Sequence, residues 1–197
     1  MSCSFCVSSH LQFASLSLNL GHRAPIRLFG DVDNANVKYI KSYKIQGTGK
    51  RGAVEMRTNT DHVLHSDVLF KMGGQNTAPQ PVELLLAALV GCTQATAVYV
   101  GRMMTPRLLI DKIEFDFGGF RDERGALELP IDQFPKIPAR LKYVRGKINI
   151  HFKKGFTPTS EQLQSLKGQT EARCPIANMM HASGCNLDIE WIDKTSA

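Results

Sequence analysis

The sequence predicts an α+β fold. Three observations support this: strand-like segments precede one long apolar helix, further strands follow it, and two more helices precede a last strand. The chain has 197 residues, of which 43% are hydrophobic and 21% are charged, which is sufficient for a buried core. We expect one domain over residues 31–197, preceded by a segment of different composition over residues 1–30.

The first elements are expected to be strands. Val37–Gln46, Ala53–Asn59 and Val63–Lys71 are rich in β-branched and aromatic residues, and Gly- and Asn-containing turns separate them. We therefore expect three short strands, joined by turns, before the helix.

A helix is expected from Pro81 to about Met104. Pro79 and Pro81 end the preceding segment, and proline is well tolerated at a first helical position. One face of this helix combines small and apolar residues: Leu85, Ala88, Leu89, Cys92, Ala95, Thr96 and Tyr99.

The same helix has the length of a membrane span, because Leu84–Gly101 carries no charged side chain. Thr93, Gln94 and Thr96 interrupt the apolar run. We therefore favour a buried central helix over a transmembrane one. A helix that is apolar on nearly every side must be covered on several sides, which points to another subunit.

The second half of the chain alternates strands and helices. We expect strands at Leu109–Phe117, Leu141–Phe152 and Asn186–Ile192, an exposed excursion at Gly118–Arg140, a helix capped by Thr159 or Ser160 that runs through Glu171, and another from Cys174 that Gly184 ends.

Two cysteines carry the chemical signal. Cys92 lies on the small-residue face of the central helix, where a buried cysteine can also be an inert small hydrophobe. Cys174 precedes Pro175 and is the expected N-cap of a helix, where the helix dipole and Arg173 lower a thiol pKa. On this local argument Cys174 is the more acidic thiol, although it can also be a cap of ordinary reactivity.

Two motifs resemble one known family. Gly73-Gly74 followed by Thr77–Thr93, and later Glu171–Ile176, resemble the OsmC/Ohr proteins, which are osmotically induced and organic-hydroperoxide-resistance proteins. The resemblance spans roughly residues 37–192 and is closer to the broad OsmC-like branch. It implies an intertwined α+β homodimer with long central helices wrapped by antiparallel sheet.

The resemblance also implies a chemistry. Cys92 matches the peroxidatic position and Cys174 the resolving one of a peroxidase that reduces organic hydroperoxides. An external dithiol, of the dihydrolipoyl type in the family, would restore the thiols. No cofactor is expected.

Two further family positions match less closely. The family's activating arginine falls in the turn Gly47–Gly52, where Arg51 is the first candidate and Lys50 the second, and a solvated basic turn is the alternative. The family's glutamate position holds Val82, and Glu83 lies on the side of a regular helix opposite Cys92. Glu83 could act through an irregular helix start or across a dimer interface, or it could simply favour the helix N-terminus.

Charge and cysteine content exclude some classes. The net charge of +6 comes from scattered basic residues without interleaved aromatics, so no nucleic-acid partner is expected. Five cysteines, an odd number, argue against a secreted disulfide scaffold.

Residues 1–30 are rich in serine and contain no acidic side chain, a transit-peptide composition that predicts a mitochondrial or other organellar location. The alternative is an untargeted tail on a cytoplasmic protein. Cys3 and Cys6 would leave with a cleaved peptide.

Cys174, His181 and Cys185 raise a metal hypothesis, but they lack the close spacing of structural zinc sites, and no metal is expected. Two functions remain open. One is a cysteine-based peroxidase. The other is an OsmC-like protein without efficient peroxidase activity that acts as a binding or structural module.

Overall fold

The computed structural model describes residues 39–195, so the expected targeting segment lies outside the described residues. By contacts between residues the chain divides into two units, Met1–Tyr43 and Lys44–Ala197. Residues 39–43 are exposed, with Lys41 Nζ 5.2 Å from the centre of the Tyr43 ring. The helices and strands described next all lie in the second unit.

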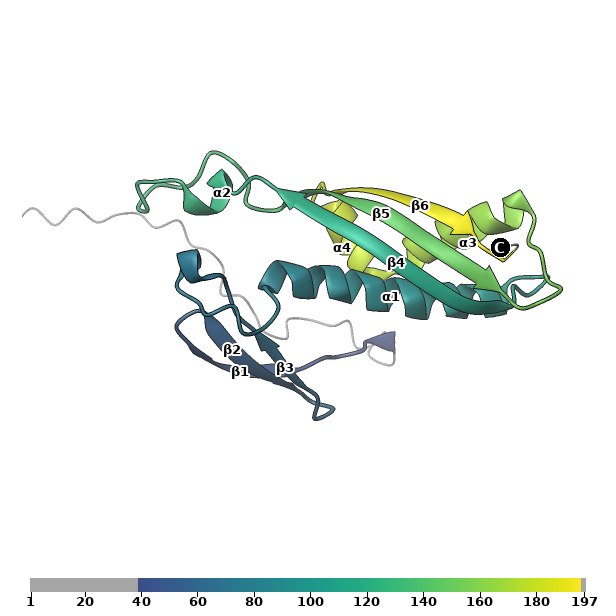
Figure 1. Cartoon of the computed structure of the whole chain (residues 1–197), viewed down its shortest axis with the longest axis horizontal. Coiled ribbons are helices and arrows are strands. Elements are labelled where there is room, and N and C mark those ends of the chain that lie inside the picture. The colour runs from purple at the N-terminus through teal and green to yellow at the C-terminus, as the bar shows by residue number, and fades with distance from the viewer. Residues whose placement is uncertain (1–38, 196–197) are drawn as a thin grey trace, which may run out of the picture. The chain divides into compact units, whose positions relative to one another are not determined.

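Two three-stranded sheets and the helices form an α+β fold, as predicted (Figure 1). The first sheet is antiparallel, in the order β1-β2-β3. In the second sheet β5 is antiparallel to β4 and parallel to β6, so the segment between β5 and β6 crosses over through helices. The elements are β1 Ile45–Lys50, β2 Ala53–Thr58, β3 Val63–Ser66, η2 Phe70–Met72, α1 Pro81–Met103, β4 Ile110–Arg121, α2 Arg124–Leu127, β5 Leu141–Phe152, α3 Ser160–Arg173, α4 Pro175–Ala182 and β6 Asn186–Asp193.

The first strand lies later in the sequence than expected. The expected strand Val37–Gln46 is wrong in its bounds, because residues 39–44 form no strand and β1 continues through Gly47 and Gly49. These glycines pair with Met56 and Val54, and a Cβ on Gly47 would lie 3.1 Å from Met56 Cγ. The pattern of glycines therefore marks a close cross-strand approach, and the turn itself has only two residues.

Three other bounds also differ. β3 ends at Ser66 instead of Lys71, because the next residues form a loop. β4 continues to Arg121, where the strand still pairs with β5, so the excursion is shorter than expected and contains α2.

The core lies between the second sheet and the helices α1, α3 and α4. Figure 1 shows α1 running alongside β4 and β5, and α1 packs against β4, α3 and α4. Fourteen buried side chains form one cluster: Leu89, Val100, Leu108, Leu141, Val144, Ile148, Ile150, Phe152, Leu166, Cys174, Ala177, Met180, Cys185 and Ile189.

The central helix forms as expected but is covered on one side only. By length and composition α1 could cross a membrane, yet it packs on core elements as the helix of a globular domain does, and 28% of its most apolar window is buried. Its buried face is Leu89, Thr93, Ala97, Val100 and Gly101. The expected face is therefore wrong at four positions, because Leu85, Ala88, Ala95 and Tyr99 are exposed. The helix instead buries the i, i+4 row that contains Leu89, Thr93 and Ala97.

Candidate functional site

The two cysteines singled out by the sequence lie together in the fold. Cys92 is half-buried on α1 and packs against the core, while Cys174 is fully buried where α3 ends and α4 begins. Both thiols are free. Cys174 belongs to the core cluster against which Cys92 packs, and Cys92 is one of the groups that raise the pKa of Cys174. The fold thus joins two thiols that are far apart in the sequence.

The pKa of Cys174 is raised, contrary to the expectation of an acidic N-cap thiol. Burial raises it most, and the side chain of Cys92 raises it further. The backbone N–H of Ala177, 3.4 Å from Sγ, acts in the opposite direction but is the smaller effect. Arg173 is not among the groups that lower this pKa, and its guanidinium donates a hydrogen bond to the Gln169 side chain. Cys174 is the N-cap of α4, as expected. The expectation that its pKa is lowered was wrong.

An asparagine holds the junction that carries Cys174. Pro175 has no backbone N–H, so the turn between α3 and α4 leaves carbonyl oxygens free. Asn178 Nδ2 lies 3.0 Å from Glu171 O, 3.1 Å from Ala172 O and 2.9 Å from Cys174 O. The sequence analysis missed this residue, although a proline directly after a helix end is a signal that such carbonyls need donors.

Glu83 lies in the first turn of the central helix. Its carboxylate accepts a hydrogen bond from the backbone N–H of Gln80 at 2.7 Å, as in a capping box. This contact corresponds to the expected interaction with the helix N-terminus. Val82, at the position where the family has its glutamate, is partly buried against the core.

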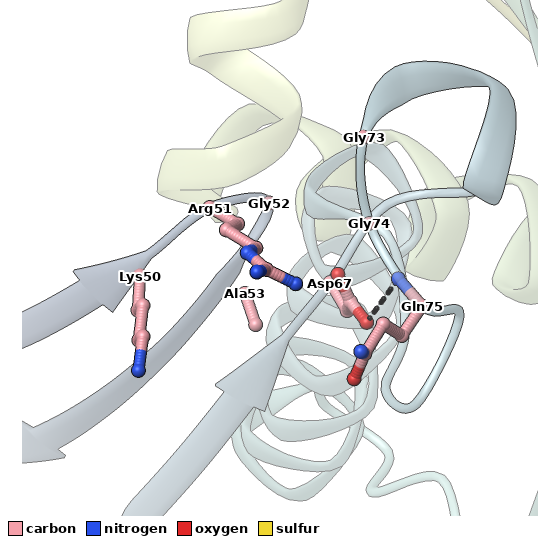
Figure 2. Close-up of a pocket in the computed structure, with 8 residues that line it drawn as sticks. All are labelled: Lys50, Arg51, Gly52, Ala53, Asp67, Gly73, Gly74 and Gln75. Carbon is pink, nitrogen blue, oxygen red and sulfur yellow. Dashed lines mark hydrogen bonds between the residues drawn. The ribbon is translucent and has the colours of Figure 1, made fainter.

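Arg51 lies in a separate pocket. It occupies the two-residue turn between β1 and β2 with a φ of 55°, and it lines a pocket of about 340 Å³ together with Lys50, Asp67, Gly73, Gly74 and Gln75. Figure 2 shows the Arg51 side chain directed toward Asp67, while Lys50 points away. No cysteine lines this pocket, so within one described chain (residues 39–195) Arg51 and the thiols belong to different sites.

Asp67 organises the wall of the Arg51 pocket, and the sequence analysis missed it. Its side chain accepts hydrogen bonds from Gln75 N at 3.0 Å, Thr77 N at 3.0 Å and Thr77 Oγ1 at 2.9 Å. These hydrogen bonds lower the pKa of Asp67 to about 2, and the one from Thr77 N lowers it most. The loop then approaches the turn so closely that a Cβ on Gly52 would lie 2.9 Å from Gly74 Cα. In the sequence, Asp67 could have been found as an aspartate that precedes the Gly73-Gly74 loop.

The metal hypothesis receives no support from the side-chain arrangement. Within residues 39–195 the structure contains no cluster of three histidine, cysteine, aspartate or glutamate side chains suited to a metal. Cys185 is a buried free thiol whose pKa is raised by burial.

Comparisons with known proteins agree with this fold. The model of one family, OsmC-like protein, matches residues 74–190. No curated protein matches the chain. The solved structure of an OsmC-like protein from Mycoplasma pneumoniae is 17% identical, covers 78% of this chain and 97% of its own, and has a TM-score of 0.59.

Two further structures show the same likeness. An OsmC-like protein of unknown function from Vibrio cholerae is 14% identical, with a TM-score of 0.60 and coverage of 78% of this chain and 99% of its own. An organic hydroperoxide resistance protein OsmC from Legionella pneumophila is also 14% identical, with a TM-score of 0.57 and coverage of 78% and 98%. At these identities the likeness establishes the shared fold.

Proposed function

Because the chain belongs to the OsmC-like protein family, we propose that it is a thiol-dependent peroxidase that reduces organic hydroperoxides through a Cys92/Cys174 dithiol–disulfide cycle. The observation that carries this proposal is that two free thiols, Cys92 on α1 and Cys174 between α3 and α4, pack on the same core cluster. If Cys92 were only an inert apolar residue of the core, a second thiol near it would not be needed.

The burial of the two thiols supports their separate roles. Cys92 is half-buried and can be reached by a peroxide, whereas Cys174 is fully buried behind it. The raised pKa of Cys174 also suits a thiol that stays protonated until it is needed. Cys92 is therefore the peroxidatic cysteine and Cys174 the resolving cysteine.

The cycle balances in three steps. The Cys92 thiolate attacks the outer oxygen of ROOH, the O–O bond breaks, and ROH leaves with a proton, so that Cys92 becomes a sulfenic acid. Cys174 then attacks the Cys92 sulfur, a disulfide forms, and the hydroxyl group leaves as water. An external dithiol of the dihydrolipoyl type reduces the disulfide and becomes a disulfide itself.

The working form is proposed to be a homodimer. α1 exposes Leu85, Val98, Tyr99 and Met103, which is unusual for the central helix of a domain. A second copy that covers this face would remove these side chains from water. It would also provide a second set of charged residues, including Arg51, for each thiol pair.

The location remains a proposal as well. The transit-peptide composition of residues 1–30 favours a mitochondrial or other organelle matrix, and a cytoplasmic protein with an untargeted tail is the alternative. A fluorescent protein fused after residue 30 distinguishes the two by its location in cells.

A second candidate function follows from two observations. Val82 replaces the family's glutamate, and Arg51 lies in a pocket without a thiol. Both favour an OsmC-like protein without efficient peroxidase activity, which acts as a binding or structural module.

The test is the oxidation of the purified protein by cumene hydroperoxide, with Cys3 and Cys6 replaced by serine so that only three cysteines remain. We expect one equivalent of peroxide to remove two thiols and to yield one cumyl alcohol, measured by intact mass and chromatography. An unchanged thiol count after a millimolar excess of peroxide would favour the binding or structural module.

A further inference from the structure

A buried hydroxyl without a partner lies one helical turn before Cys174. Thr170 is 1% exposed, and no group among the described residues forms a hydrogen bond with its Oγ1 atom. The indole Nε1 of Trp191 is also buried and has no hydrogen-bond partner among the described residues. Leaving a buried polar group unsatisfied costs about 1–3 kcal/mol, so two such groups together call for an explanation.

Both residues line one small cavity beside the resolving thiol. The cavity has a volume of about 10 Å³, close to what one water molecule needs. Its lining combines apolar side chains of the core with five polar or ionisable ones, and it consists of Leu89, Thr93, Ile148, Thr170, Glu171, Cys174, Ala177, Leu187, Ile189 and Trp191. Glu171 is half-buried and therefore lies where the cavity meets the surface.

The proposed cycle requires a proton to leave this cavity. Only a thiolate attacks sulfur effectively, and Cys174 is a buried thiol. Among the lining residues Glu171 is the other group that titrates, while β5 and β6 present Ile148, Leu187, Ile189 and Trp191, which do not. From α1 the facing titratable group is Cys92, which is oxidised when Cys174 reacts.

We propose that Thr170 and Trp191 hold a water molecule beside Cys174, and that this water passes the Cys174 proton to Glu171 when the disulfide with Cys92 forms. The inference rests on the proposed dithiol cycle. Thr170 is a positioning residue in this step, and Glu171 is the proton acceptor.

The step balances without a further reactant. The S–H bond of Cys174 breaks, and its proton moves through the water to the Glu171 carboxylate. The S–S bond forms as the S–O bond of the Cys92 sulfenic acid breaks. The leaving hydroxide takes a proton from solvent, and Glu171 returns its proton to solvent, so the net product is one water molecule.

A peroxide-free assay isolates this step. One equivalent of 2,2′-dithiodipyridine converts Cys92, the half-buried thiol, into a thiopyridyl mixed disulfide in the full-length chain with Cys3 and Cys6 replaced by serine. Attack by Cys174 then releases thiopyridone, which is followed by absorbance over a range of pH. If the protein proves not to reduce peroxides, this assay still reports on the proton route.

Thr170→Val removes the hydroxyl at nearly constant volume, and we expect closure of the disulfide to slow about tenfold, as for the loss of one important hydrogen bond. Glu171→Gln should slow it to a similar extent. In both variants the rate should rise more steeply with pH, because hydroxide has to take the proton. Thr170→Ser should restore the rate.

The matched control is Glu190→Gln, an exposed carboxylate on β6 outside the cavity, which should leave the rate unchanged. If Thr170→Val does not fold, Glu171→Gln and Thr170→Ser carry the test. Closure at the wild-type rate and with the wild-type pH profile in Glu171→Gln overturns the inference. So does an equal slowing by Thr170→Val at every pH, which indicates a structural effect.

Discussion

Cys92 on α1 packs against the core cluster that contains Cys174 at the start of α4, and of the two only Cys92 is partly open to solvent. In the proposed cycle the accessible thiol would react with the oxidant, and the buried thiol would then react with the sulfenic acid. Pro175 and Asn178 fix the backbone from which the covered thiol acts.

The exposed apolar face of α1 predicts a dimer. Tyr99→Glu should give a monomer, because a buried charge without a partner is strongly unfavourable at an interface. Light scattering at micromolar concentration measures the mass. Gln164→Glu, which places the same charge on the exposed side of α3, should remain a dimer. A folded wild-type monomer at that concentration would refute the prediction.

Arg51 is predicted to act on Cys92 from a second copy of the chain. Arg51→Ala should slow the first oxidation of Cys92 about tenfold, since a nearby cation favours a thiolate by a pKa unit or more. Lys50→Ala is the control, because Lys50 lines the same pocket but points away from Asp67. The measurement is stopped-flow oxidation by cumene hydroperoxide. Equal rates in both variants would leave Arg51 with a role in its own pocket only.

Asp67 predicts a loss of stability in acid. Its pKa falls from 3.8 to about 2 in the folded protein, so the unfolded chain binds more protons between these values. The contribution of Asp67 is complete above pH 4 and is lost as the pH falls toward 2. Asp67→Asn should lower the urea midpoint at pH 7 and should weaken its dependence on pH between 4 and 2. Parallel pH curves for the two proteins would contradict this account.

Asn178 is predicted to stabilise the junction between α3 and α4. Asn178→Ala removes a donor to three carbonyl oxygens, so the free energy of unfolding should fall by about 1 kcal/mol. Urea unfolding followed by circular dichroism measures the change. His181→Ala, an exposed substitution on the same helix, should have a much smaller effect.

The sequence predicted the elements where local signals are strong. Thr159 and Gln162 form the capping box that begins α3, and Pro175 after Cys174 begins α4, both within a residue of expectation. The expected end of β1 was wrong, because Gly47 and Gly49 resemble turn residues locally, while their cross-strand neighbours place them in a strand.

The site was predictable only in part. The two cysteines could be found from their surroundings in the sequence, and their contact could be expected only from the family resemblance. The raised pKa of Cys174 could not be expected locally, because it depends on burial by the β5, β6 and α1 side chains around it. Thr170 was missed for the same reason, since only the fold leaves its hydroxyl without a partner among the described residues. The sequence offered a signal for Asp67, but the hydrogen bonds that its carboxylate accepts form only on folding.

The assignment of Cys92 as the peroxidatic cysteine is tested most directly by mapping which thiol reacts first. The single variants Cys92→Ser and Cys174→Ser are oxidised with one equivalent of cumene hydroperoxide, trapped with dimedone and analysed by peptide mass. We expect Cys174→Ser to carry one dimedone adduct on Cys92, because the resolving thiol is absent, and Cys92→Ser to reduce no peroxide. Oxidation of Cys174 in Cys92→Ser at the wild-type rate would contradict the assignment.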